Sequence, residues 1–267
     1  MKKLLTILFV IFALTAFVTS CEKEPQPAPQ GTDTPTNTEF PTSKPECAPF
    51  TKQFVDGGFE NCWYWQSTQN NTYLEYQSSV LLSLNMLHAL EDMIPGTTAP
   101  FSAFCDSLTP HSGRFAMKLV SGRIHDDNNG ELFLPGAIAP LNETFISEFL
   151  SDGNINVKKP YTEKPTALKG YYKYTPVEGD TASVSVKLYN GDEVIAEGTF
   201  VEKNTVSGWT EFNIPITGAN YDAVTPTHIS IIISASAGYD FSNLMNCVGK
   251  EGSTLWIDDF ELVFPNK

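Results

Sequence analysis

The chain has 267 residues, enough for one or two domains, and carries 17 Lys and Arg against 31 Asp and Glu, a formal net charge of −14 at pH 7. A chain with this negative charge is repelled by nucleic-acid phosphates and by anionic lipid surfaces. We therefore expect no nucleic-acid partner. Aromatic residues make up 12% of the sequence, which favours a packed β protein over a helical bundle.

Residues 1–20 have the features of a secretory signal peptide, with two lysines, an unbroken apolar run and small residues at the end. The apolar run is at the short end for spanning a bilayer, which makes a transmembrane anchor the weaker alternative. The ending Val-Thr-Ser-Cys resembles the bacterial lipobox, in which the Cys is diacylated and the chain is cut just before it. That resemblance implies that Cys21 is the lipid-bearing first residue of the mature protein and its only link to the membrane.

Residues 21–50 are rich in Pro, Thr and Glu and contain too few apolar residues to form a core. We therefore expect an extended, semi-rigid tether in front of a folded domain at residues 51–267. The acidic start of the tether, Glu22-Lys23-Glu24, resembles the export signals of surface lipoproteins in some Gram-negative lineages. The sequence thus predicts an exported protein, lipid-anchored to the outer membrane and exposed at the cell surface.

Four cysteines remain besides Cys21, namely Cys47, Cys62, Cys105 and Cys247. An even number in an exported chain predicts two disulfides, with three connectivities open. A free buried thiol is the alternative for any one of these residues. No spacing of Cys and His indicates a zinc site.

Short alternating runs separated by turn residues predict β-strands from about residue 51 onwards. Residues 80–93 are ambiguous between a short helix and an irregular strand. Asn-Gly-Asp at residues 190–192, between two alternating runs, predicts a hairpin, and residues 209–216 and 228–236 predict two further strands. Many short antiparallel strands in one domain imply a β-sandwich, and no nucleotide-binding or zinc-protease motif occurs in the sequence.

The stretch EGSTLWIDDFELVF, residues 251–264, places two carboxylates inside an otherwise apolar strand. Simple alternation puts Trp256, Asp258 and Phe260 together on the core face, with Asp259 on the opposite face. A buried carboxylate requires a partner, whether a cation, hydrogen-bond donors or a metal ion.

The segments DGGFENCW, HSGRFAMKL, KPTALKGYYKYTPVEGD, SASAGYDF and GSTLWIDDFEL follow one another in an order that resembles the putative carbohydrate metabolism domain family of bacterial lipoproteins. The resemblance covers most of residues 54–264. It implies a jelly-roll β-sandwich of the galactose-binding-like, carbohydrate-binding-module type, with a glycan as partner and other surface glycan-utilisation proteins as neighbours. Residues 67–110 depart from the pattern as a longer, less regular insertion.

In jelly-roll carbohydrate modules the first and last strands lie side by side, and a structural calcium often bridges them. The resemblance places the carboxylates of Glu60 and Asp258 at this position, where Ca²⁺ would take six to eight oxygen ligands. Gly57 and Gly58 would allow close backbone approach, and the loop around residues 112–113 would lend a carbonyl.

Two alternatives to this calcium site stay open. Asp258 could instead pair with Arg114 or Lys118, or reach solvent at the strand end. The acidic loop at residues 125–131 also has carboxylates and amides at calcium-like spacing, although such Asp/Asn/Gly clusters are usually plain turns.

Sugar recognition needs flat aromatic rings together with hydrogen-bonding side chains on one exposed face. Alternation along residues 167–175 turns Tyr171 outward between Lys169 and Lys173, and along residues 209–216 it turns Trp209 outward with Glu211 and Asn213. The candidate ligand-binding residues are Tyr171, Lys173, Trp209, Glu211, Trp63 and Trp65. The alternative for each ring is that it covers a sheet edge or packs under a loop.

No pair of carboxylates is placed by local spacing as in a glycosidase, and no nucleophile elbow occurs, so no catalytic residue is predicted. The sequence therefore favours a non-catalytic glycan-binding module. A glycoside hydrolase using a carboxylate pair is one alternative. A structural adhesin or accessory subunit of a surface complex, with an unpaired edge strand or a large apolar patch, is the other.

Overall fold

The structure is a computed structural model that describes residues 53, 57–66, 72–76, 78, 80–127, 130–141, 145, 156–241 and 244–265. The predicted signal peptide and tether, including Cys21 and Cys47, lie outside these residues. In the part of the chain that is described, strands dominate and the longer helical segments are one 3₁₀ and one α-helical turn. No helix among these residues is long and apolar enough to cross a membrane. The prediction of an all-β chain is confirmed.

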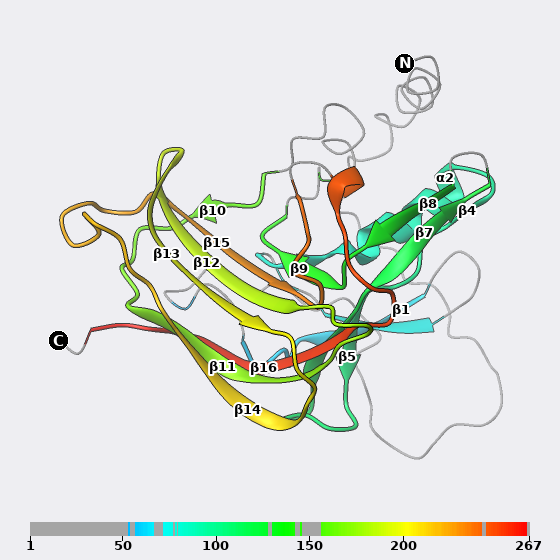
Figure 1. Ribbon diagram of the computed structural model, residues 1–267, viewed down its shortest axis with the longest axis horizontal. Coiled ribbons are helices and arrows are strands. Elements are labelled where there is room, and N and C mark those ends of the chain that lie inside the picture. The colour runs from blue at the N-terminus through cyan, green and yellow to red at the C-terminus, as the bar shows by residue number, and fades with distance from the viewer. Residues whose placement is uncertain are drawn as a thin grey trace, which may run out of the picture.

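Two antiparallel sheets form a β-sandwich with jelly-roll character (Figure 1). The first sheet has the order β13-β12-β15-β9-β3, with β10 also paired to β15. Its strands are β3 (Leu82–Ser83), β9 (Ala137–Ala139), β10 (Lys159–Pro160), β12 (Ala182–Asn190), β13 (Glu193–Glu202) and β15 (His228–Ser234). The second has the order β14-β11-β16-β6-β5. Its strands are β5 (Ala103–Asp106), β6 (Ala116–Val120), β11 (Ala167–Thr175), β14 (Val206–Pro215) and β16 (Thr254–Val263).

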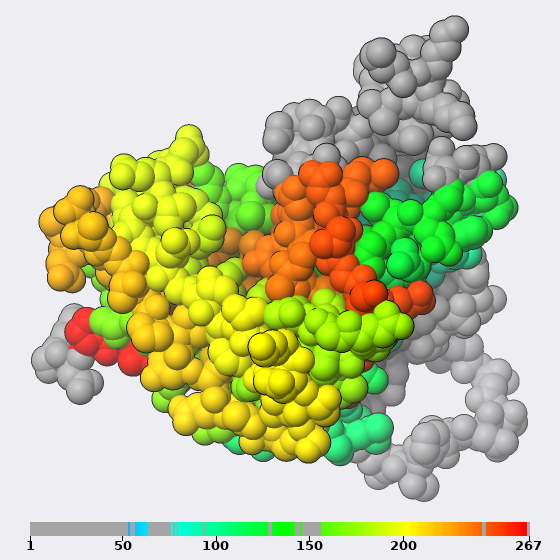
Figure 2. Space-filling model, in the orientation of Figure 1, coloured from blue at the N-terminus to red at the C-terminus, as the bar shows by residue number. Residues whose placement is uncertain are grey.

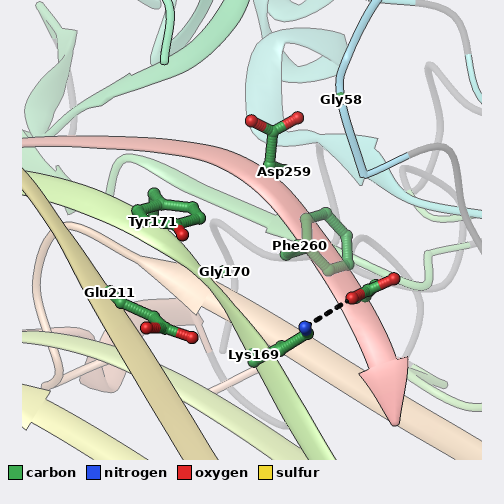
Figure 3. A pocket seen from close by; sticks show the side chains of 8 residues that line it. Gly58, Lys169, Gly170, Tyr171, Glu211, Asp259 and Phe260 are labelled. Atoms are coloured by element: carbon green, nitrogen blue, oxygen red, sulfur yellow. Dashed lines mark ion pairs between the residues drawn. The ribbon is translucent and has the colours of Figure 1, made fainter. Parts of the chain in front are cut away.

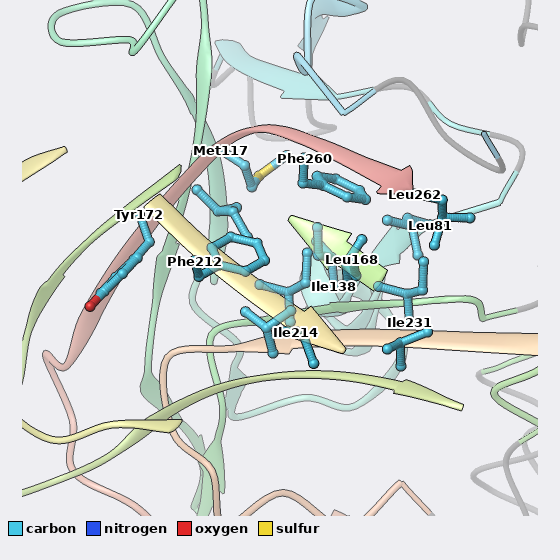
Figure 4. Close-up of a cluster of buried hydrophobic side chains, with 14 of the residues drawn as sticks. Leu81, Met117, Ile138, Leu168, Tyr172, Phe212, Ile214, Ile231, Phe260 and Leu262 are labelled. Atoms are coloured by element: carbon cyan, nitrogen blue, oxygen red, sulfur yellow. The ribbon is translucent and has the colours of Figure 1, made fainter. Parts of the chain in front are cut away.

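The sandwich core lies between these sheets and follows the predicted alternation (Figure 4). On β11, Leu168, Gly170, Tyr172 and Tyr174 are buried, and the residues that alternate with them between Leu168 and Tyr174 are partly exposed. On β12 and β15 the alternating core residues are at most 1% exposed, namely Val184, Val186, Leu188, Ile229, Ile231 and Ile233. The predicted turn joins β12 to β13. Burying these branched and aromatic side chains against the facing sheet is the main force that holds the two layers together.

A second, smaller core packs beside the sandwich. It lies under a three-stranded sheet of β4 (Thr97–Thr98), β7 (Gly122–Asp126) and β8 (Gly130–Leu134), which is covered by η1 (Leu84–Ala89), α2 (Leu90–Met93) and η2 (Leu244–Asn246). Figure 2 shows the η2 region, in orange, lying against the green β7–β8 region. The predicted insertion therefore contributes ordered elements, and its ambiguous part forms a two-residue strand followed by helical turns.

A hairpin of β1 (Cys62–Gln66) and β2 (Thr72–Tyr76) forms a separate two-stranded sheet. A disulfide between Cys62 and Cys105 ties it to β5. Cys247 is a free, buried thiol whose pKa is raised by burial. The prediction of a second disulfide is therefore wrong for Cys247, where the alternative of a buried thiol holds.

The resemblance predicts that the first and last strands lie side by side, and in the structure the backbone at Gly57, before the first strand, contacts the last strand. The N–H of Phe260 donates to the carbonyl of Gly57 at 3.2 Å, and a Cβ added to Gly57 would lie 1.7 Å from the Phe260 carbonyl oxygen. Only a glycine fits so close an approach. The strands paired with β16 are β11 and β6, however, whereas the first strand, β1, belongs to the separate hairpin.

Candidate functional site

Strand β16 is bulged at Asp258 and Asp259. Asp259 has a φ of +46°, and the register between β16 and β11 shifts beside it. Because a bulge adds one residue to a strand, the side-chain alternation reverses across it. The buried apolar residues of β16 are accordingly Leu255 and Ile257 before the bulge and Phe260 and Leu262 after it.

This bulge overturns the predicted face of Trp256. Its side chain is only partly buried and lies opposite Lys173 on the outer face of the sheet, away from the core position of Phe260. Asp258 is fully buried, as predicted, but for a different reason. It lies opposite the outward Tyr171 and is covered by the β5–β6 loop (residues 107–115).

Hydrogen-bond donors are the partner that the structure gives to Asp258. Its Oδ2 accepts the backbone N–H groups of His111 at 2.7 Å and Ser112 at 3.2 Å, and its Oδ1 accepts the N–H of Asp259 at 2.8 Å. Burial raises the pKa of Asp258 to about 6, although these hydrogen bonds act in the opposite direction. Lys118 lies over the Trp256 ring at 5.4 Å.

The Glu60 carboxylate accepts N–H groups from the same loop. Its Oε1 receives hydrogen bonds from the backbone of Arg114 at 2.9 Å and Phe115 at 3.3 Å. Both predicted calcium carboxylates therefore use oxygens to hold the β5–β6 loop, and an ion would have to compete with these donors. Among the described residues no group of three or more His, Cys, Asp and Glu is arranged to hold a metal. The donor set as it stands is a poor fit to Ca²⁺, and the calcium site stays a prediction.

Tyr171 points outward as predicted, but one face of its ring is already covered. The imidazole of His111 stacks on it with centroids 3.7 Å apart and planes 15° apart. His111 also meets the Trp209 ring edge-on at 5.8 Å. Histidine spacing gave no sign of this role, because the contact joins the β5–β6 loop to strands far along the chain.

Asp259 fixes His111 above the sheet. Its Oδ2 lies 2.6 Å from Nδ1 of His111, and its Oδ1 accepts the hydroxyl of Ser112 at 2.8 Å. These contacts orient the imidazole, which in turn sets the position of the Tyr171 ring. The neighbouring carboxylates Asp258 and Asp259 thus hold one turn of the loop through its backbone and its side chains.

Trp209 and Lys173 are half-buried beneath the same loop. The indole Nε1 of Trp209 donates to the carbonyl of Thr109 at 3.1 Å, and Lys173 donates to the Thr109 hydroxyl at 2.7 Å. The Lys173 ammonium lies 4.5 Å from the Trp209 ring centroid, and burial lowers the pKa of this lysine. For Trp209 the alternative of packing under a loop therefore describes the geometry well.

A surface pocket of about 350 Å³ opens next to Tyr171 (Figure 3). It is lined by Gly58, Lys169, Gly170, Tyr171, Glu211, Asp259, Phe260 and Glu261. The volume falls at the lower end of the range for small-molecule sites. Lys169 and Glu261 form an ion pair of 2.8 Å across two paired strands, and Glu211 stands opposite Tyr171 on β14.

The pocket brings together only part of the predicted site. Tyr171 and Glu211 line it, whereas Lys173 and Trp209 lie under the neighbouring loop. Trp63 and Trp65 belong to β1 in the separate hairpin, and the side chain of Trp65 lies outside the described part of the structure. The pocket also contains three charged residues that were not among the candidates, namely Lys169, Asp259 and Glu261. Of these three, Lys169 was predicted to point outward beside Tyr171, from the alternation along β11.

Two solved structures share this fold. A "putative glycoside hydrolase" from Bacteroides vulgatus has a TM-score of 0.54 and 17% identity, over 77% of this chain and 96% of that one. A second structure with the same description, from Bacteroides thetaiotaomicron, has a TM-score of 0.54 and 16% identity, over 87% and 73% of the two chains. At such identities the likeness shows the fold alone.

A family 16 carbohydrate-binding module also matches, with a TM-score of 0.36 and 12% identity over 65% of this chain and 92% of that one, which is too low to argue from. Comparisons with models of protein families and with curated proteins gave no match.

Proposed function

We propose that this chain is a surface-anchored lipoprotein whose β-sandwich binds a glycan without cleaving it and serves polysaccharide capture. The observation that carries the proposal is the pocket beside Tyr171. An aromatic ring offers a surface for the apolar face of a sugar, while carboxylates and an ammonium offer acceptors and donors for its hydroxyl groups. The fold shared with proteins described as glycoside hydrolases supports a glycan as the partner.

The placement of the titratable groups favours binding over hydrolysis. A glycosidase needs a general acid whose raised pKa keeps it protonated next to the scissile bond. Among the described carboxyl groups Asp258 has a raised pKa, but it is fully buried beneath the β5–β6 loop and does not line the pocket.

A glycoside hydrolase is the second candidate, because Glu211 and Asp259 both line the pocket from the strands on either side of β11. Strands two positions apart are about 10 Å apart, close to the carboxylate separation of inverting enzymes. Release of reducing sugar from a bound polysaccharide, abolished in Glu211→Gln, would favour this candidate over a binding module.

Tyr171→Ala is expected to weaken glycan binding at least about tenfold, because the substitution removes the aromatic wall of the pocket. The variant also loses its stacking on His111, at about 1 kcal/mol, so its melting temperature should fall only slightly. Binding is measured by isothermal titration with the polysaccharide that scores highest on a glycan array.

Tyr189→Ala is the matched control, since Tyr189 is a partly exposed tyrosine on β12 in the other sheet. It should leave the affinity unchanged. Full affinity in Tyr171→Ala would show that the glycan binds elsewhere.

Cys21→Ala is expected to abolish lipidation and to move the protein from the membrane fraction to the soluble fraction. The lipobox-like sequence motivates this expectation, because the diacylated thiol would be the only membrane anchor. Fractionation and incorporation of labelled fatty acid measure the effect. Cys247→Ala, which removes a buried free thiol, is the control and should stay anchored. A Cys21→Ala protein that stays in the membrane with unchanged mobility would contradict the anchor.

A further inference from the structure

We infer that the pocket beside Tyr171 selects glycans that carry a free, protonated amine over their N-acetylated and anionic counterparts. This inference rests on the proposed glycan binding and adds the class of sugar to it. The four charged side chains that line the pocket are one lysine and three acids, Lys169, Glu211, Asp259 and Glu261. The pocket therefore carries a net negative charge on an already acidic protein.

Three of these four charges are already engaged within the protein. The Lys169 ammonium is paired with Glu261 at 2.8 Å, and this carboxylate raises the pKa of the lysine. Both oxygens of Asp259 are in contact with the β5–β6 loop, one with the His111 ring and one with the Ser112 hydroxyl. The single cation of the pocket lining is thus neutralised and unsuited to receive an anionic sugar.

Glu211 is the charged side chain of the pocket lining whose carboxylate is available to a ligand. It is exposed on β14 and forms none of the ion pairs found among the described residues, although its charge adds to that of Glu261 in raising the pKa of Lys169. Its register partner on β11 is Tyr171, so the carboxylate and the aromatic ring lie side by side, as Figure 3 also shows. A carboxylate next to an aromatic ring is the combination that recognises an ammonium, through a charge-assisted hydrogen bond and a cation–π contact.

A hexosamine with an unsubstituted amine fits this pair. Its ring can lie against Tyr171 while its ammonium reaches Glu211. N-acetylation removes the charge, and a uronic acid places a carboxylate opposite Glu211, where like charges repel. Selection between these sugars therefore depends on Glu211 more than on any other residue of the pocket.

The test is the affinity of the purified full-length chain for three oligosaccharides of equal length, made of glucosamine, N-acetylglucosamine or galacturonic acid. The titrations are run at about 0.15 M salt, which screens attraction by the acidic surface as a whole. Wild type should bind the glucosamine oligomer at least about tenfold more tightly than the N-acetylated one, and the galacturonate oligomer most weakly.

Glu211→Gln should bring the two hexosamine affinities within about twofold of each other by weakening only the first. Glu193→Gln, which neutralises an exposed glutamate at the start of β13 in the other sheet, is the matched control and should keep the preference. A wild type that binds glycans through Tyr171 without preferring the free amine, or a preference that survives Glu211→Gln, would overturn the inference and leave the proposed function standing. A chain that binds no glycan at all would overturn both.

Discussion

Breaking the Cys62–Cys105 disulfide is expected to lower the free energy of unfolding by about 3–4 kcal/mol. The bond closes a loop with a sequence separation of 43 residues, and the chain-entropy relation gives about 4 kcal/mol for a loop of that length. The loop contains β2, β3, η1, α2 and β4, so its closure restrains, in the unfolded chain, the helical segments that cover the second core. Export of the chain, as proposed above, would place the bond in an oxidising environment, where disulfides persist.

Urea unfolding of wild type and of the double variant Cys62→Ala/Cys105→Ala measures this effect, each with and without reductant. Reductant should destabilise wild type and leave the double variant unchanged. Cys247→Ala is the control, because it removes a buried thiol outside the disulfide and should keep the full response to reductant. If reduction left the unfolding free energy of wild type unchanged, the bond would not constrain the unfolded chain.

Regular strands could be predicted from the sequence because their burial is regular. In β11 and β14 one face packs on the core and the other meets solvent, so alternation alone placed Tyr172 and Phe212 inward and Tyr171 and Glu211 outward. The hairpin between β12 and β13 followed from its Asn-Gly turn for the same local reason.

The bulge in β16 could not be predicted from alternation. One extra residue reverses every side chain beyond it, and the positive φ that marks it falls on an aspartate. The prediction therefore put Asp258 in the core with Trp256, whereas it lies on the outer face under a loop. Two adjacent acids inside an apolar strand were the only local sign that the alternation changes there.

The candidate site was incomplete because its geometry is set by long-range contacts. His111 lies 148 residues from Asp259 in sequence, and no periodicity links them. The β5–β6 loop covers Trp209 and Lys173 and leaves Tyr171 at the edge of a pocket, which decides the outward residues that stay available to a ligand. The pairing of Cys62 with Cys105 was open for the same reason, since local sequence does not specify connectivity.

Asp258 is expected to make the protein lose stability as the pH rises from about 4 to about 6. Burial raises its pKa in the folded state to about 6, from an ordinary value of 3.8. Between these values the folded state binds more protons than the unfolded state, so the free energy of unfolding falls with rising pH. The contribution of Asp258 is fully present below pH 4 and is lost above pH 6, and a difference of about two units corresponds to roughly 3 kcal/mol.

A shared calcium ion at Asp258 and Glu60 predicts the opposite sign. Calcium requires ionised carboxylates, so protons would compete with the ion and stability would rise with pH over the same range. A chelator would then lower the melting temperature, because an ion that binds only the folded state stabilises it by mass action. The direction of the pH dependence therefore separates a carboxyl held by backbone N–H groups from a metal ligand.

Urea unfolding of wild type and Asp258→Asn at several pH values between 4 and 7.5, each with and without chelator, distinguishes the two cases. Asparagine does not titrate, so subtracting the two curves isolates Asp258 from the other acids. The free energy of unfolding of wild type minus that of Asp258→Asn should fall as the pH rises, and it should be the same with and without chelator. The control variant Glu193→Gln, which replaces an exposed acid, should show the same pH dependence of the free energy of unfolding as wild type. A difference between wild type and Asp258→Asn that rises with pH and loses this rise when chelator is added would establish the calcium site. Asp258 and Glu60 would then form a metal centre in which an ion replaces their hydrogen bonds to the β5–β6 loop.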